Sequence, residues 1–180
     1  IYSSGVDDGI SGQDYLASYE YAKAELDKFG STDASDFAAA TDHHYYNDPS
    51  WFYENADYYD EDNYKRDVEN MTDTIYGGGL KVFVGEYASW SNTLNSALSE
   101  AAYMTGLERN GDIVRMAAYA PLFGNLTATH WSPDLIWFNN HQVTGSINYY
   151  VQKIFSLNQG THLYDSTLDG ALIEQKNLSG

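Results

Sequence analysis

Two short polar segments follow apolar runs in this chain and carry side chains suited to acid–base or nucleophilic catalysis. Glu86 comes after the apolar run 80–84 and a single glycine. His44 and Tyr46 come after the apolar segment 37–40. Reacting groups of α/β proteins gather where parallel strands end, so these side chains predict one shared site. The alternative for Glu86 is that it caps the helix expected a few residues later.

The spacing of apolar residues predicts strands and helices in alternation. Short runs rich in β-branched, aromatic and small residues predict three parallel strands buried on both faces. These strands span residues 37–46, 80–84 and 113–120. Apolar residues every three or four positions predict helices over 14–29, 91–109 and 147–157. Such alternation is typical of an α/β fold with a parallel sheet.

Several shorter segments complete the expected order of elements. Ser91 or Asn92 is expected to cap the helix that ends at residue 109. Trp51 and Phe52 are expected in a loop, because Pro49 follows the first strand. The remaining expectations are an acidic helix over 57–73, a short strand at 136–138 and, after Gly160, short strands such as 162–164 that open a β domain.

Composition narrows the class of partner. Nine basic and 26 acidic residues give a net charge of −17, which repels nucleic acid and anionic membranes. Seventeen tyrosines and four tryptophans favour a sugar ligand, because aromatic faces stack on the C–H groups of sugar rings. The alternative is that most of these rings form the core. No apolar run reaches the length of a membrane span, and no cysteine is present.

Three sequons favour a secreted glycoprotein. They begin at Asn70, Asn125 and Asn177.

Seven strings along the chain together resemble glycoside hydrolase family 51, the retaining α-L-arabinofuranosidases, most closely its secreted fungal-type members. They occur in the order in which that family has them and cover nearly the whole chain. The strings are SSGVDDG (3–9), DHHYYNDPSWF (42–52), VFVGEYASW (82–90), SEAAYMTGLERNGD (99–112), VRMAAYAPLFGN (114–125), WSPDLIWFNN (131–140) and YYVQKIF (149–155).

The resemblance implies a fold and a domain division. Residues 1–157 would be the second half of a (β/α)8 TIM barrel, from the end of strand 5 through strand 8. Residues 158–180 would begin a C-terminal β-sandwich. The chain would then be part of a larger protein, and its partners would be the upstream half of the barrel and the rest of the sandwich, on the same or a separate polypeptide.

The resemblance also implies site residues. Glu86 would be the catalytic nucleophile, and His44, Tyr46 and Trp90 would be substrate-binding residues. His44 would hydrogen-bond within the carboxylate network, Tyr46 would orient Glu86, and Trp90 would line the arabinose pocket. The general acid would come from an Asn-Glu pair upstream and so would not be in this chain. No cofactor and no metal are implied. His43 would face away from the site because neighbouring strand residues alternate.

The function implied is that of a secreted enzyme that releases terminal α-L-arabinofuranosyl residues from arabinoxylan or arabinan. Relatives on the same scaffold act as endoglucanases or on xylosides or galactofuranosides, and a non-catalytic carbohydrate-binding protein is the alternative from another class. The string Glu108-Arg109-Asn110 lies at an expected helix end, where an ion pair or a cap is the expected role.

Overall fold

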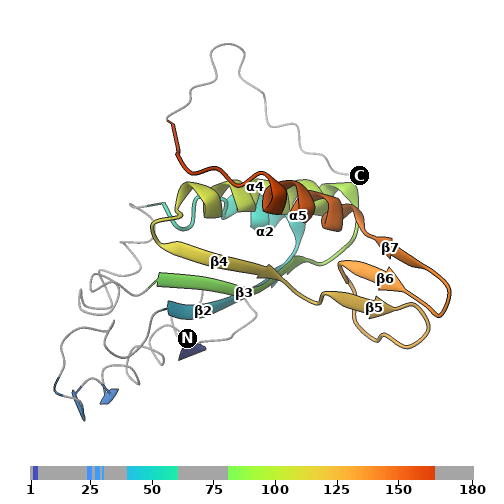
Figure 1. Cartoon of the computed structure of the whole chain (residues 1–180), viewed down its shortest axis with the longest axis horizontal. Coiled ribbons are helices and arrows are strands. Elements are labelled where there is room, and N and C mark those ends of the chain that lie inside the picture. Colours follow the sequence, from blue (N-terminus) through green and yellow to red (C-terminus); the bar gives the residue numbers. More distant parts are fainter. Residues whose placement is uncertain are drawn as a thin grey trace.

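A four-stranded parallel sheet organises the described chain (Figure 1). The computed structural model describes residues 2–3, 24–25, 27–28, 30, 40–60 and 81–164. The strands pair in chain order, each parallel to the next. They are β1 (Tyr2–Ser3), β2 (Ala40–Asn47), β3 (Lys81–Ser89) and β4 (Val114–Tyr119). The parallel sheet and its last three strands are therefore confirmed, although residues 37–39 of the first expected run lie outside the described residues.

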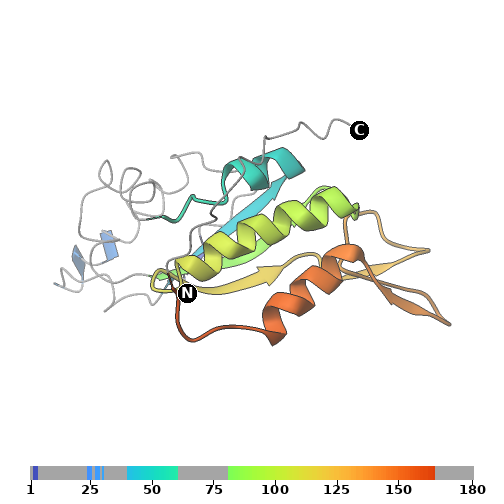
Figure 2. The same cartoon turned by 90° about the horizontal axis from the view of Figure 1, so that it is seen from above.

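Three helices cover one face of this sheet. They are α2 (Pro49–Glu54), α4 (Leu94–Arg109) and α5 (Ile147–Leu157). Seen from above in Figure 2, α4 lies over the strands, with α2 on one side and α5 on the other. The helices expected over 91–109 and 147–157 are confirmed. Of the helix expected over 14–29, the described residues 24–25 and 27–28 are helical, and Gly30 ends that turn with φ of 68°.

Two expectations about local structure around these helices are wrong. Trp51 and Phe52 lie in α2 and not in a loop, because Pro49 occupies the first turn, where its missing N–H removes no helical hydrogen bond. The N-cap of α4 is Thr93, whose side chain accepts a hydrogen bond from Ser96 N. Asn92 is engaged instead by side chains far along the chain.

A smaller sheet follows β4. Its strands are β5 (Phe123–Asn125), β6 (Ile136–Phe138) and β7 (Val143–Gly145). The strand expected at 136–138 is confirmed, while β5 and β7 were not expected, since three residues are too few to show an alternation. β5 runs parallel and β7 antiparallel to β6.

An aromatic core fills the space between the parallel sheet and the helices. Five fully buried rings form it: Tyr45, Phe52, Tyr59, Tyr87 and Tyr103. Fully burying an aromatic side chain of this kind contributes roughly 1.5 to 3 kcal/mol. For these residues the alternative interpretation of the aromatic content, a core role, is confirmed.

The opposite face of the sheet has no helix over it in the described part of the chain (Figure 1). Along β3 the side chains of Val82 and Val84 are buried, whereas Phe83 between them is partly exposed. On β4, Met116 is 47% exposed. The expectation that these strands are buried on both faces is therefore wrong for the described chain. An open sheet of four strands is not a closed barrel, so the barrel and the division at residue 157 stay predictions.

Two expected elements lie at the edges of the described ranges, and neither is present in the residues described there. Residues 57–60 form turns, and the rest of the acidic helix expected over 57–73 lies outside the described residues. Residues 162–164 are not in a strand, and Leu163 and Tyr164 are exposed, because none of the described strands pairs with them. In the described part of the chain, no helix combines the length and the apolar composition that a membrane crossing requires.

Candidate active site

Strand β2 divides its side chains between the two faces of the sheet. His43 and Tyr45 are buried on the face that the helices cover. Asp42, His44 and Tyr46 alternate with them and therefore lie on the other face, because strand side chains repeat with a period of two. The side-by-side placement of His44 and Tyr46 agrees with their spacing in the sequence.

A β-bulge at Gly85 brings Glu86 to the same face. His43 is opposite Val84 in the register, but His44 is opposite Glu86, so Gly85 is an extra residue in β3. Val84 before the bulge and Tyr87 after it are both buried. In an unbroken strand Glu86 would share the face of Val84, and the extra residue turns it towards His44.

Two hydrogen bonds and one longer polar contact link the side chains on this face. The Tyr46 hydroxyl donates to Glu86 Oε2 at 2.7 Å. His44 Nδ1 lies 3.6 Å from the same oxygen, and His44 Nε2 lies 3.2 Å from Asp42 Oδ2. The Glu86 side chain is 42% exposed, against 18% for His44. The result is a carboxylate that is held on one side and open to solvent on the other.

This arrangement suits a nucleophilic carboxylate. A hydrogen bond from a phenol stabilises the negative charge of a carboxylate and restricts its rotation. Both contacts given above go to Oε2, so Oε1 is the atom better placed to attack a substrate. The expectation that Glu86 stands at the end of its strand is wrong. It lies three residues before that end, since Tyr87, Ala88 and Ser89 continue to pair with β2.

Asp42 belongs to the same set of polar contacts, although it was not predicted from the sequence as a site residue. Its carboxylate contacts His44, and its Oδ1 occupies the space beside Gly85. A Cβ at Gly85 would lie 2.0 Å from that oxygen, so any larger residue there would displace the Asp42 carboxylate. The spacing of Asp42, His44 and Tyr46, each two residues apart, was a signal that could have identified Asp42.

Two tryptophans differ in their position relative to Glu86 and Tyr46. The indole ring of Trp131 packs edge-on against the ring of Tyr46, with centroids 5.6 Å apart and an interplanar angle of 74°. Trp131 was not predicted as a site residue. Trp90, which was predicted, follows the last residue of β3 and is 57% exposed. Four residues of extended strand span roughly 13 Å, so Trp90 would bind a part of the ligand distant from Glu86.

His43 has a structural role, as its alternation with His44 predicted. Its Nδ1 lies 2.8 Å from the Tyr59 hydroxyl and 3.1 Å from the Tyr45 hydroxyl. Burial, with a smaller contribution from His44, lowers the pKa of His43 to about 3. His43 is therefore a neutral member of a buried hydrogen-bond cluster.

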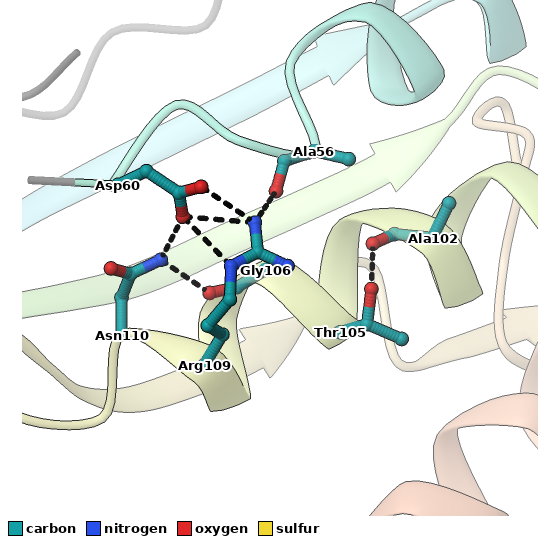
Figure 3. Close-up of polar contacts among 7 residues, drawn as sticks. All are labelled: Ala56, Asp60, Ala102, Thr105, Gly106, Arg109 and Asn110. Carbon is teal, nitrogen blue, oxygen red and sulfur yellow. Dashed lines mark hydrogen bonds and ion pairs between the residues drawn. The ribbon is translucent and has the colours of Figure 1, made fainter. Parts of the chain in front are cut away.

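Arg109 and Asn110 of the string Glu108-Arg109-Asn110 have the ion-pair and capping roles expected there (Figure 3). Arg109 forms an ion pair with Asp60, with Nε donating to Oδ1 at 2.9 Å. Asn110 is the C-cap of α4, and its amide nitrogen donates to Asp60 and to the Gly106 carbonyl. These contacts tie the end of α4 to the turn that follows α2.

The described ranges of the chain contain no group of three or more His, Cys, Asp or Glu side chains that could hold a metal ion.

Comparison with protein-family models places Glu86 and Trp90 inside a known family, while Asp42, His44 and Tyr46 lie before the matched range. The model for the α-L-arabinofuranosidase C-terminal domain matches residues 85–178, which begin at the bulge in β3. The extracellular exo-α-L-arabinofuranosidase of Streptomyces chartreusis is 50% identical over 125 residues, which are 69% of this chain and 14% of that protein. α-L-arabinofuranosidase 1 of Arabidopsis thaliana is 41% identical over 125 residues, covering 64% and 18% respectively.

Solved structures agree with this comparison. The arabinose-bound MgGH51 α-L-arabinofuranosidase is 30% identical and superposes with a TM-score of 0.57, over 83% of this chain and 26% of that one. The GH51 arabinofuranosidase of Xanthomonas axonopodis pv. citri, at 15% identity and a TM-score of 0.54, supports the fold alone. The chain spans less than a fifth of the length of the Streptomyces and Arabidopsis relatives.

Proposed function

Because this chain belongs to the α-L-arabinofuranosidase C-terminal domain family of glycoside hydrolase family 51, we propose that the complete protein releases terminal α-L-arabinofuranosyl residues from arabinoxylan or arabinan. Glu86 is the nucleophile of a retaining reaction in this proposal. The observation that carries it is the 2.7 Å hydrogen bond from Tyr46 to a carboxylate that a bulge has turned to the open face of the sheet.

The proposed reaction has two steps. Glu86 Oε1 attacks the anomeric carbon, a C–O bond to the enzyme forms, and the glycosidic C–O bond breaks as a second carboxyl group protonates the leaving oxygen. That group, now a carboxylate, then removes a proton from water, which attacks the same carbon and restores Glu86. In retaining enzymes the two carboxyl groups lie about 5 to 5.5 Å apart.

We place the general acid outside this chain. Asp42, the other carboxylate in this set of contacts, contacts His44 and lies beside Gly85. It supports His44 in this scheme and does not reach the leaving group. The partially exposed face of β3 and β4 is where we expect the other half of a barrel to cover the sheet and supply the acid.

We also propose that the protein is secreted and that Asn125 is glycosylated. The Streptomyces relative is named extracellular. Asn125 Oδ1 accepts hydrogen bonds from Thr127 N and Thr127 Oγ1, and Thr127 is exposed, so the sequon is presented at the surface. Asn70 and Asn177, the other two candidates, lie outside the described residues.

The test of the nucleophile uses the complete protein with Glu86→Gln and a matched control, Glu108→Gln, which changes an exposed carboxylate on α4. We expect Glu86→Gln to abolish turnover of an aryl α-L-arabinofuranoside while Glu108→Gln keeps it, since an amide is a very poor nucleophile. An arabinofuranose-like aziridine should label Glu86, as peptide mapping would show. Activity of Glu86→Gln within tenfold of wild type would refute the assignment, and turnover of an aryl glucoside or xyloside alone would change the substrate class.

A further inference from the structure

We infer that Glu100 is a positioning residue for the proposed site: it fixes the end of β3, the segment that carries Glu86 and leads to Trp90. The inference rests on the proposed function, because it gives Glu100 a part in the same reaction. Glu100 belongs to α4 and therefore lies on the helix side of the sheet, whereas Glu86 lies on the open side. It acts through the backbone and does not touch the substrate.

The first contact joins Glu100 directly to β3. Its side chain is 0% exposed, and a buried carboxylate is unfavourable unless hydrogen bonds replace its water. Ser89 N donates to Glu100 Oε1 at 2.9 Å. Ser89 is the last residue of β3, and the next residue, Trp90, donates its N–H to the Asn47 carbonyl of β2 at 2.9 Å. The strand end is thus held from α4 on one side and from β2 on the other.

Two amides of α5 lie beside Glu100 and accept hydrogen bonds from the segment that follows Glu86. Asn148 Oδ1 accepts from Asn92 Nδ2 at 3.0 Å, and Gln152 Oε1 accepts from the Tyr87 hydroxyl. Both amides lie near enough to the Glu100 carboxylate to lower its pKa, although Asn148 Nδ2, Gln152 Nε2 and Glu100 Oε2 make no hydrogen bond within the described residues. Asn148 is the buried residue of α5, so this helix packs on the molecule through a polar side chain where an apolar one would be expected.

All three connections from this cluster lead to one short segment. Tyr87 donates to Gln152, Ser89 N donates to Glu100, and Asn92 donates to Asn148. These positions follow Glu86 and surround Trp90. The hydrogen bonds that the side chains of Glu100, Asn148 and Gln152 accept therefore all come from residues 87–92.

The charge of Glu100 is sensitive to pH in the neutral range. Burial raises its pKa to about 7, although the donors on Asn148, Ser89 and Gln152 counter part of the rise. The titratable groups that face it are Tyr87 on β3 and Tyr119 on β4, and burial raises the pKa of both phenols far above its usual value. α5 faces it with neutral amides. Glu100 is therefore the member of this cluster that changes charge near pH 7.

The first experiment measures how well the backbone amides at the end of β3 are protected from exchange, and it does not depend on activity. Hydrogen–deuterium exchange of backbone amides is compared between the complete wild-type protein and its Glu100→Gln variant. The variant keeps an acceptor for Ser89 N but turns an amino group towards the amino groups of α5. We expect exchange across residues 86–92 to be at least tenfold faster, with β2 unchanged. Unchanged exchange in 86–92 would overturn the inference whatever the activity.

The second experiment asks whether this restraint matters to catalysis. We expect Glu100→Gln to lower kcat/KM for an aryl α-L-arabinofuranoside at least tenfold per folded molecule, with Glu108→Gln as the control. The ratio of wild-type to Glu100→Gln kcat/KM should change with pH around a midpoint near 7, since only the wild type titrates there. A ratio that stays near one, or a loss explained entirely by a lower melting temperature, would overturn the positioning role.

A second variant covers the case in which Glu100→Gln does not fold. Gln152→Met keeps a side chain of similar length and removes the amide between Tyr87 and Glu100, so both measurements should change in the same direction by a smaller factor. Equal exchange and equal kcat/KM in this variant would count against the inference. Failure of the proposed function would appear separately, as an absence of turnover by the wild-type protein, and the exchange result would still decide whether Glu100 fixes the strand end.

Discussion

Two adjacent tyrosines of β2 allow catalysis and stability to be separated with one type of substitution. Tyr46 faces the open side of the sheet and donates to Glu86 at 2.7 Å. Tyr45 faces the core, where its hydroxyl lies 3.1 Å from His43 Nδ1 and 2.8 Å from the Tyr59 hydroxyl. Replacing either tyrosine by phenylalanine removes one oxygen and keeps the ring.

The two losses differ in kind and in size. A hydrogen bond to a charged group contributes about 1.5 to 3 kcal/mol. If the bond from Tyr46 is stronger in the transition state, Tyr46→Phe should lower kcat about 10- to 100-fold, because each 1.36 kcal/mol in the barrier is a factor of ten. The Tyr45 hydroxyl has neutral partners, so Tyr45→Phe should lower the free energy of unfolding by about 1 kcal/mol and leave kcat nearly unchanged.

The assay measures kcat on an aryl α-L-arabinofuranoside and the melting temperature for both variants of the complete protein. We expect Tyr46→Phe to melt close to wild type, since its hydroxyl contacts a partly exposed carboxylate. Tyr45→Phe should melt a few degrees lower at wild-type kcat. The reasoning would be refuted by an unchanged kcat together with a large fall in melting temperature for Tyr46→Phe, because Tyr46 would then be structural.

Three further predictions concern the bulge, the core and the tryptophans. Gly85→Ala would place a Cβ 2.0 Å from Asp42 Oδ1, so we expect kcat/KM to fall at least tenfold, and a wild-type value would show that the bulge is not needed. The buried neutral His43, with its pKa lowered from 6.5 to about 3, stabilises the fold above pH 6.5, and this contribution of several kcal/mol is lost as the pH falls towards 3. Urea unfolding of His43→Gln should therefore depend less on pH than that of wild type between pH 6.5 and 3, and parallel curves would contradict this. Trp90→Ala should raise KM for oligosaccharides more than for the aryl arabinofuranoside, whereas Trp131→Ala, which removes the ring beside Tyr46, should affect both alike; steady-state kinetics on both substrates distinguishes the two.

Local periodicity was sufficient to find the elements that carry the site. Apolar runs and helical spacing predicted β2, β3 and β4 and the helices α4 and α5, because side-chain period follows directly from backbone geometry. Spacing of two also predicted that His44 and Tyr46 share a face and that His43 does not. The proposed roles of these residues, and that of Glu86, came from motifs and stay predictions.

The orientation of Glu86 could not be derived from its own strand. Alternation from Val82 and Val84 would have placed it among the helices, and only the pairing with β2 shows that Gly85 is an extra residue. A bulge is a property of two strands in register, and the spacing within either strand does not contain it.

The restraint on the end of β3 depends even more on packing. Ser89, Glu100 and Asn148 lie on three elements, and nothing in the order of residues shows that a carboxylate of α4 meets a backbone N–H of β3 beside an amide of α5. Such a contact forms because the layers bring polar groups that are distant in the sequence into a buried space, where a carboxylate is unfavourable unless a donor reaches it. Sequence periodicity therefore identified which residues stand on each strand and helix, while the contacts between the layers determined which of them hold the proposed nucleophile in place.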